Sequence, residues 1–298
     1  MTLVRTWLKA TACLVLLCGA SAVGQRAHLE IAGVAELFAP GIASTHYSEI
    51  RLTLSPDGKT ALWFSRDRPG GPGGYDIWVS RRSNGAWTPA TPVSFNTGGR
   101  DFDPAFSADG RFVYFCSDRP GGSGGDDIYR VAVRGEGFGA PVNLGPTVNS
   151  AGKEFAPMLS PGGNILLFSS DRSGGAGGHD LFTAHRSRNG FASARRLPGA
   201  LNTLANEFDA TFLRDGTTIV FARAMDFRTD RVDLLFAVPS KPGYDVGTML
   251  PAAVNNEHDT YGPMLDWSDR GRLIFSGQRG GGGMDLYRIP YRILHSRG

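Results

Sequence analysis

The 298-residue chain is poor in cysteine, in long apolar runs and in surplus charge of either sign. Cys13 and Cys18 lie near its start, so only Cys116 remains further along and no disulfide is expected in that part. The formal net charge of +3 is not the strongly basic balance typical of nucleic-acid binders, and no nucleic-acid partner is expected. No apolar stretch reaches the roughly 20 residues that a membrane-spanning helix needs.

Residues 1–22 have the order of a secretory signal peptide. Arg5 and Lys9 precede an apolar run from Ala10 to Gly19, and the small residues 20–22 supply a cleavage pattern. We expect this segment to be removed from the mature protein. Export without disulfides favours a periplasmic or secreted bacterial protein.

Glycine is in excess, at 41 residues, and much of it falls in the loops of a repeated unit. Each unit has a phenylalanine after a turn, at intervals of 51 to 54 residues. An aspartate before an apolar pair follows each phenylalanine. The phenylalanines are Phe64, Phe115, Phe168, Phe221 and Phe275, and the aspartates are Asp76, Asp127, Asp180, Asp233 and Asp285.

Each unit is predicted to form four short strands. In the third unit these are residues 154–159, 165–169, 180–185 and 191–197, separated by turn residues. Units of four strands and about 50 residues are typical of β-propeller blades. The sequence therefore predicts an all-β chain with one five-bladed propeller.

The two ends of the repeat array predict how the ring closes. The last unit stops after its third strand, and residues 35–38 resemble the fourth strand of other units. We therefore expect the N-terminal strand to complete the last blade, which removes exposed sheet edges. The expected boundaries are a linker at 23–34, the propeller at 35–291 and a C-terminal tail at 292–298, in a monomeric protein.

The repeat resembles the TolB-type propeller repeat of bacterial envelope proteins, a relative of WD-type blades. The resemblance is carried by Ser55-Pro56-Asp57-Gly58, by the segment 117–129, and by Asn202-Thr203 ahead of Glu207-Phe208. It implies a non-catalytic propeller that binds an envelope protein or a cell-wall glycan on the face bearing the glycine-rich loops. Similar repeats also occur in peptidases and lyases.

Acidic and basic residues that recur in several units are expected to be structural, because a catalytic group is unique in a chain. Their side chains would fix the glycine loops through hydrogen bonds. The glycines themselves are expected to permit tight connections with positive φ. Calcium binding is the alternative for these loops, but the copies lie too far apart to share ions, so no cofactor is expected. The structural set comprises Asp67, Arg68, Asp118, Arg119, Asp171, Arg172 and the five aspartates named above.

Departures from the repeat are better candidates for a binding site. The turns before the first and last units carry His46-Tyr47 and Glu257-His258-Asp259, which ring closure would bring to one sector. A metal site there is conceivable from the residue types, but no ligand spacing supports it. In the fourth unit charged and aromatic residues replace the glycine loop, and Arg223, Phe227 and Arg228 are the candidates for partner contact.

An enzyme is the competing interpretation. The chain has no Gly-x-Ser-x-Gly, His-Glu-x-x-His or Walker pattern. A hydrolase or lyase acting on carbohydrate would need unique carboxylates around the central channel. The acids expected on the inner strands are Glu49, Asp101, Asp103, Glu154, Glu207 and Asp209. Cys116 aligns with Ser65, Ser169, Ala222 and Ser276, at a position expected to need a small side chain for packing.

Overall fold

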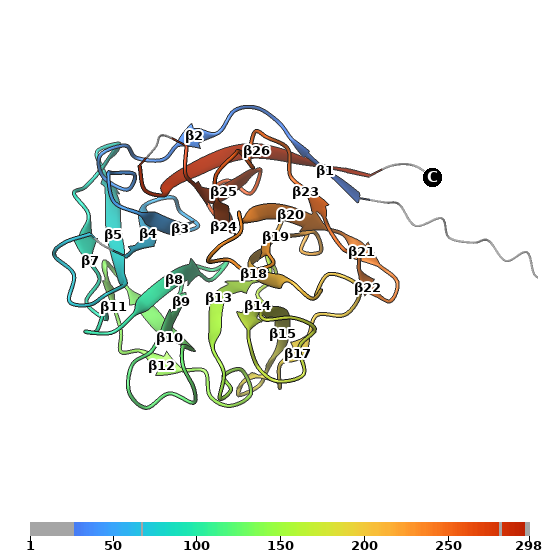
Figure 1. The fold of residues 1–298 in the computed structure, drawn as a ribbon. Coiled ribbons are helices and arrows are strands. Elements are labelled where there is room, and N and C mark those ends of the chain that lie inside the picture. Colours follow the sequence, from blue (N-terminus) through green and yellow to red (C-terminus); the bar gives the residue numbers. More distant parts are fainter. Residues whose placement is uncertain (1–26, 67, 280–281, 296–298) are drawn as a thin grey trace, which may run out of the picture.

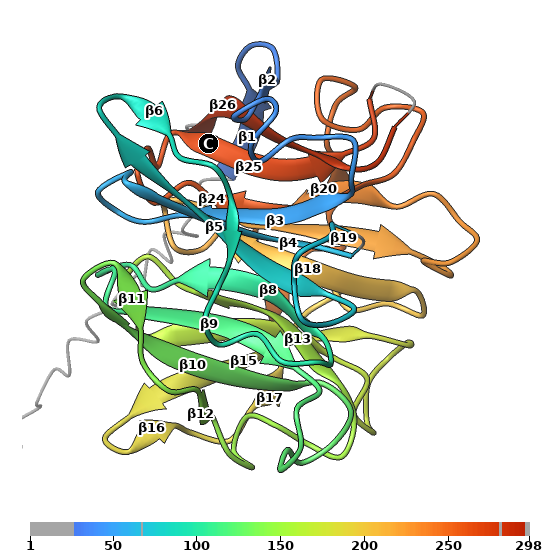
Figure 2. The same cartoon turned by 90° about the vertical axis from the view of Figure 1, so that its left-hand side faces the viewer.

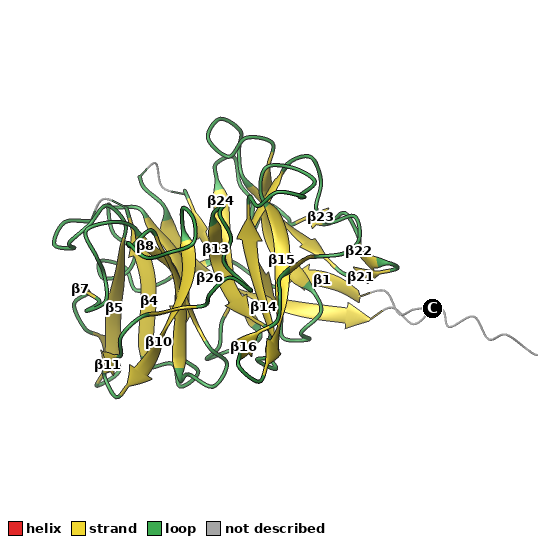
Figure 3. Ribbon diagram, turned by 90° about the horizontal axis from the view of Figure 1, so that it is seen from below, coloured by secondary structure: helices red, strands yellow, loops and turns green. Residues whose placement is uncertain are grey.

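The computed structural model describes residues 27–66, 68–279 and 282–295. These residues form five antiparallel sheets arranged as a ring, which confirms the predicted five-bladed propeller (Figure 1). Strands and loops make up the described ranges, without a helix (Figure 3). Accordingly, the described residues offer no helix long and apolar enough to cross a membrane.

Each blade has three full strands and a fourth strand in short pieces. Blade 1 comprises β3 (Glu49–Leu54), β4 (Thr60–Ser65), β5 (Asp76–Ser83), β6 (Ala86–Trp87) and β7 (Thr91–Pro92). Blade 2 comprises β8 (Asp101–Phe106), β9 (Phe112–Ser117), β10 (Asp127–Arg134), β11 (Gly137–Phe138) and β12 (Val142–Asn143). Blade 3 comprises β13 (Glu154–Leu159), β14 (Ile165–Ser170), β15 (Asp180–Ser187), β16 (Gly190–Phe191) and β17 (Arg195–Arg196).

Blades 4 and 5 vary this plan. Blade 4 comprises β18 (Asn206–Phe212), β19 (Ile219–Ala224), β20 (Asp233–Ala237) and β23 (Thr248–Met249), with a separate hairpin of β21 (Pro239–Ser240) and β22 (Gly243–Tyr244). Blade 5 comprises β24 (Thr260–Leu265), β25 (Arg272–Gly277) and β26 (Asp285–His295), together with β1 (Ala27–Ile31) and β2 (Glu36–Leu37).

The chain closes the ring by pairing its two ends. β2 pairs with β26 through Glu36↔Arg288 and Leu37↔Tyr287, in the place predicted for the closing strand. β1 also pairs with β26, over the five residues opposite Tyr291–His295 (Figure 1). The expected linker at 23–34 and tail at 292–298 therefore contain paired strand residues. The ladder extends to Ala27 and His295 because β1 covers the backbone groups that β26 would otherwise leave unpaired.

The blades pack face to face (Figure 2). In blades 1 and 2 the second strand is buried from its second residue to its last. Strand register identifies the aromatic anchor of blade 1 as Trp63 rather than the expected Phe64. Trp63 pairs with Trp78 as Phe115 pairs with Tyr129. Counting from the following aspartate misplaced the anchor, because the β4–β5 loop is one residue longer than the β9–β10 loop.

This correction changes the prediction for the Cys116 position. Register places Phe64, rather than Ser65, beside Cys116, Ser169, Ala222 and Ser276. Blade 1 thus carries a large aromatic where the sequence predicted a uniformly small residue. Its ring packs against Tyr75 and Phe102, with ring centroids 5.7 and 5.8 Å apart.

The glycine loops contact the next blade, and this contact explains part of their composition. Gly70 has the expected positive φ of 103°. Gly73, in contrast, is required by close approach, since a Cβ there would lie 2.3 Å from the Gly99 carbonyl oxygen. Gly124 and Gly177 meet the following blade's turn in the same way. Each such loop therefore joins two blades.

Gly73→Ala should lower the free energy of unfolding by about 2 kcal/mol, because the added methyl group meets backbone that cannot rotate away. Gly74→Ala is the matched control, since a Cβ at Gly74 would have no atom within 4 Å. Urea unfolding of both variants and the wild type measures the difference. Equal stability of the two variants would show that the blade contact tolerates a side chain.

Candidate functional site

The carboxylates at the start of four inner strands share one set of contacts, which we call the latch. In each latch a residue four positions earlier donates two hydrogen bonds to the carboxylate, and an arginine lies beside it. Glu154 accepts hydrogen bonds from the Ser150 backbone N–H (2.6 Å) and hydroxyl (2.6 Å), and Arg172 lies 3.0 Å away. The same arrangement surrounds Glu49, Asp101 and Glu207. All four carboxylate side chains are fully buried. These residues are therefore positioned as structural latches rather than as free channel acids.

The latch arginines stack on aromatic rings. Arg172 lies over Phe168 and Phe182, at 5.3 and 4.8 Å from the ring centroids. Arg119 and Arg68 lie over the corresponding pairs in their blades. Such cation–π contacts hold the guanidinium in place against the buried carboxylate.

The recurring aspartates hold loop backbone. Asp118 accepts from the Arg100 N–H at 2.7 Å and Asp171 from the Lys153 N–H at 2.6 Å. Asp76, Asp127 and Asp180 accept from N–H groups of the glycine loops. Asp233 instead pairs with Arg231, and Asp285 begins β26. Asp67 lies outside the described residues.

Arg223, a predicted partner-contact residue, belongs to the same latch. It lies 2.7 Å from Glu207 and donates to the carbonyl oxygens of Leu201 and Val246 at 2.8 Å. Arg223 pairs with Asp233 in the sheet of blade 4, and Ser170 pairs with Asp180 at the same place in blade 3. Arg223 is therefore equivalent to Ser170, and it reaches Glu207 from a position two residues before the one that Arg172 occupies in blade 3. These contacts support a structural role for Arg223, and its expected contact with a partner stays a prediction.

A pocket of about 250 Å³ opens where the inner strands begin, on the glycine-loop face, and we call it the channel-mouth pocket. Every blade contributes the second residue of its inner-strand repeat. This ring consists of Ile50, Phe102, Phe155, Phe208 and Tyr261. Phe64, Tyr75 and Phe227 add further aromatic wall, and Arg66 and Asp259 also line the pocket.

The ring points into the pocket because each inner strand is bulged. The register shifts after the second residue, and the third residue has a positive φ in every blade. A bulge redirects the side chains on either side of it. The third positions are Arg51, Asp103, Ala156, Asp209 and Gly262.

Three of these third positions form a buried charge cluster beneath the ring. Arg51 Nε lies 3.8 Å from an Asp103 oxygen, and Arg51 Nη1 lies 3.8 Å from an Asp209 oxygen. Both aspartates also line the pocket. Burial raises the pKa of Asp103, and the neighbouring Asp209 carboxylate raises it further. Burial also raises the pKa of Asp209, against the lowering effect of Arg51.

The cluster also links the blades. The Ala156 N–H donates to Asp103 and the Gly262 N–H donates to Asp209, both at 3.1 Å. Arg51 Nη2 donates to the Pro157 carbonyl oxygen at 3.2 Å. Each charged residue therefore contacts the backbone of another blade.

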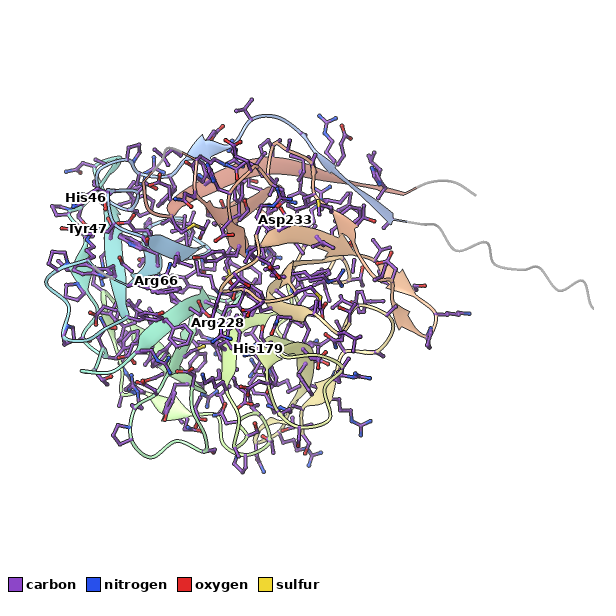
Figure 4. All side chains as sticks on the ribbon, viewed as in Figure 1. His46, Tyr47, Arg66, His179, Arg228 and Asp233 are labelled. Carbon is purple, nitrogen blue, oxygen red and sulfur yellow. The ribbon has the colours of Figure 1, made fainter. Side chains whose placement is uncertain are left out.

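The predicted patch from blades 1 and 5 forms two separate parts. His46 and Tyr47 lie at the outer edge of the ring and line a shallow hollow with Arg68 and Asp285 (Figure 4). On the blade 5 turn, Glu257 and His258 are exposed, with 3.8 Å between carboxylate and imidazole. Residues of blade 5 contact each part separately, since the Gln278 N–H donates to the Asp259 carbonyl oxygen and Gly283 lies against Tyr47.

Two predicted residues lie at the channel-mouth pocket. Asp259 lines it, anchored by the Val232 N–H at 3.0 Å. Phe227 comes from the loop that replaces the glycine pattern and packs against Phe208 and His179, with centroids 5.7 and 5.6 Å apart. Arg228 lies near the centre of the ring, exposed and paired with Asp226 (Figure 4).

Within ranges 27–66, 68–279 and 282–295, no three His, Cys, Asp or Glu side chains are grouped so that they could hold a metal ion. In three of the glycine loops the aspartates face loop N–H groups. In each of these aspartates Oδ2 accepts the loop N–H, whereas Oδ1 is buried without a hydrogen-bond partner.

Sequence reasoning missed the aromatic ring and Arg51. One signal was available. The residue after each of the four inner-strand acids, and after Thr260 in the fifth unit, is apolar or aromatic, while the next residue varies between arginine, aspartate, alanine and glycine. A position that varies within an otherwise regular repeat is not fixed by the packing of the blade, so it is a candidate for a role specific to one blade.

Comparisons with known proteins identify the fold. No family model matches the chain, and no curated protein matches its sequence. The structure is similar to TolB from Acinetobacter baumannii (TM-score 0.52, 15% identity, 82% of this chain and 54% of that chain). It is also similar to a putative TolB from Agrobacterium tumefaciens (TM-score 0.52, 14% identity, 85% and 92%).

A glycoside hydrolase shows a likeness of the same degree. An alpha-L-arabinofuranosidase from Lactobacillus brevis is similar with a TM-score of 0.53 and 8% identity, over 84% of this chain and 92% of that chain. At such identities the likeness extends to the fold and not to the function. The chain is a five-bladed β-propeller with TolB-like architecture.

Proposed function

We propose that this protein is an exported, non-catalytic propeller that binds a protein of the bacterial envelope on its glycine-loop face, with one group of the partner entering the channel-mouth pocket. The pocket itself carries this proposal. Five blades build it, and the one loop that breaks the glycine pattern adds Phe227 to its wall. The signal peptide expected at 1–22 and the TolB-like fold support the envelope location.

A protein partner is favoured over a glycan by the residues around the pocket. On blade 4, Leu204, Met225 and Phe227 are 82%, 66% and 44% exposed on the glycine-loop face. Exposed apolar residues grouped beside a pocket mark interaction sites. Aromatic, methionine and arginine side chains are those enriched at protein interfaces, and Arg66 and Arg228 complete the set.

Affinity purification of tagged protein spanning residues 23–298, from gently crosslinked envelope extract, tests this proposal. Phe227→Ala should reduce recovery of a stoichiometric protein partner about tenfold, because an aromatic anchor at a pocket contributes about 1–2 kcal/mol or more. Met249→Ala, which removes a 54% exposed side chain from the outermost strand of blade 4, should leave recovery unchanged. Recovery of glycan alone, or equal recovery with both variants, would overturn the proposal.

The alternative is a carbohydrate-active hydrolase or lyase. Asp103 and Asp209 favour it, because two carboxyls with raised pKa face one pocket. Against it, both carboxylates accept backbone hydrogen bonds and flank Arg51. Turnover of arabinan or an aryl arabinofuranoside by the wild type, lost in Asp103→Asn, would replace the binding proposal with this one.

A further inference from the structure

The channel-mouth pocket carries more negative than positive charge. Among the described lining residues, Asp103, Asp209 and Asp259 stand against a single arginine, Arg66. Arg51 beneath the floor adds one positive charge. With every carboxyl ionised, the formal balance is −1, and one buried guanidinium is shared by two carboxylates. Burial raises the pKa of Asp103 and Asp209, and a cation in the pocket would favour their ionised forms.

The walls of this pocket are aromatic on two sides. Phe64, Tyr75 and Phe102, from blades 1 and 2, form one cluster with centroid distances of 5.7 to 5.8 Å. A second cluster comes from blades 3 and 4, with centroid distances of 5.1 to 6.5 Å. Phe155, Phe208 and Phe227 of this cluster line the pocket, and His179 contacts Phe155 and Phe227. Ring faces and a carboxylate floor together attract a cation.

We infer that the group entering the channel-mouth pocket is a monovalent organic cation, namely the side chain of a lysine or arginine of the partner protein. This inference rests on the proposed function and specifies what the pocket recognises. A neutral apolar group would desolvate the floor carboxylates without replacing their hydration. An anion would add a third negative charge beside Asp103 and Asp209. A basic side chain supplies the missing charge, and its methylene stem packs on the rings.

Arg66 is the one basic side chain lining the pocket that would oppose this ligand. Its guanidinium donates to the Tyr261 hydroxyl at 3.4 Å, which draws it to the Tyr261 side of the pocket. Asp259 lines that pocket too and offsets its charge. His179 belongs to the second aromatic cluster, and its ring Nδ1–H donates to Asn206 Oδ1 at 3.0 Å, so its ring is also anchored.

Binding of three blocked amino-acid probes to the 23–298 protein tests the inference by NMR titration. The probes are the N-acetyl methylamides of lysine, Nε-acetyl-lysine and norleucine, which share a stem and differ in charge. The lysine probe should bind at least about tenfold more tightly than either neutral probe, as expected for a desolvated cation over aromatic rings. Equal binding of all three, or no binding of the lysine probe, would overturn the inference.

Variants give a second readout. Asp209→Asn should weaken the lysine probe about tenfold and leave norleucine binding unchanged, whereas Glu257→Gln, which neutralises an exposed carboxylate on the same face, should change neither. Circular dichroism verifies that each variant is folded. If Asp209→Asn does not fold, the probe series on the wild type still decides.

The outcomes also separate this inference from the proposed function. If all probes bind equally and Phe227→Ala abolishes their binding, the pocket binds a partner group but does not select charge, and only the inference fails. If free choline or a polyamine binds much more tightly than the lysine probe, the pocket selects a small free cation. The charge selection then stands, and the protein partner is overturned.

Discussion

Arg51→Met should lower the free energy of unfolding by about 3–5 kcal/mol at neutral pH, as expected when one partner of a buried ion pair is removed. Arg51 is fully buried and is the counter-charge that Asp103 and Asp209 share. Methionine fills much of the same volume and occupies the same positive-φ position, so the backbone strain is similar in both proteins. The expected decrease in the free energy of unfolding is therefore due to the lost positive charge of Arg51.

The pH dependence of this loss has a defined sign. The folded-state pKa of both aspartates is already raised by burial, so their ionisation opposes folding as pH rises above the unfolded value of about 3.9. Without Arg51 the pKa of each rises further. Urea unfolding should therefore show a larger deficit at pH 7.5 than at pH 5.

The triple variant Arg51→Met, Asp103→Asn, Asp209→Asn provides the control. Removing all three charges should recover most of the stability, because no buried carboxylate then lacks a counter-charge. A deficit in Arg51→Met that is the same at both pH values and persists in the triple variant would show that lost packing, rather than charge, is responsible.

Glu49→Gln and Glu154→Gln should have opposite consequences at pH 8, although the two residues occupy equivalent latches. In blade 3, Arg172 lies 3.0 Å from Glu154, and neutralising Glu154 should cost about 2–3 kcal/mol. In blade 1, Arg68 is 3.6 Å from Glu49. There desolvation dominates and raises the pKa of Glu49 from 4.5 to about 7. Glu49→Gln should therefore be at least as stable as the wild type.

The dependence of stability on pH provides a second test of the raised pKa of Glu49. Because the folded pKa of Glu49 is above its unfolded value, its contribution to stability is present below pH 4.5 and is lost as pH rises through 7. The difference corresponds to about 3 kcal/mol. Stability of the wild type should thus fall relative to Glu49→Gln between pH 5 and pH 8. Parallel profiles would contradict the shifted pKa.

Much of the fold could be predicted from the sequence because the same local pattern of turns and strands occurs five times. Turn residues, alternating strands and an aspartate at the head of each third strand define a blade without reference to its neighbours. The closing strand near Glu36 was predicted on the same basis and is confirmed. β1 was not, since Ala27–Ile31 belongs to no recognisable copy of the repeat.

The candidate site was only partly predictable. Phe227 and Asp259 were found as departures from the repeat, and both line the channel-mouth pocket. Arg223 was a departure as well, but its side chain performs the ordinary latch function from a displaced position. A departure from the repeat therefore had two different meanings. At Phe227 and Asp259 it marked a residue that lines the pocket, and at Arg223 it marked the usual ion pair made from another position. Only side-chain contacts distinguish the two.

The sequence by itself determined the propeller and its number of blades, because these depend on contacts within a blade or with the next one. Only the tertiary structure decided what the five blades build together. Arg51, Asp103 and Asp209 stand in three different blades and meet because each inner strand bulges at the same step toward one axis. Their grouping depends on the bulge in each inner strand and on which blades meet at the axis, and the repeat pattern specifies neither.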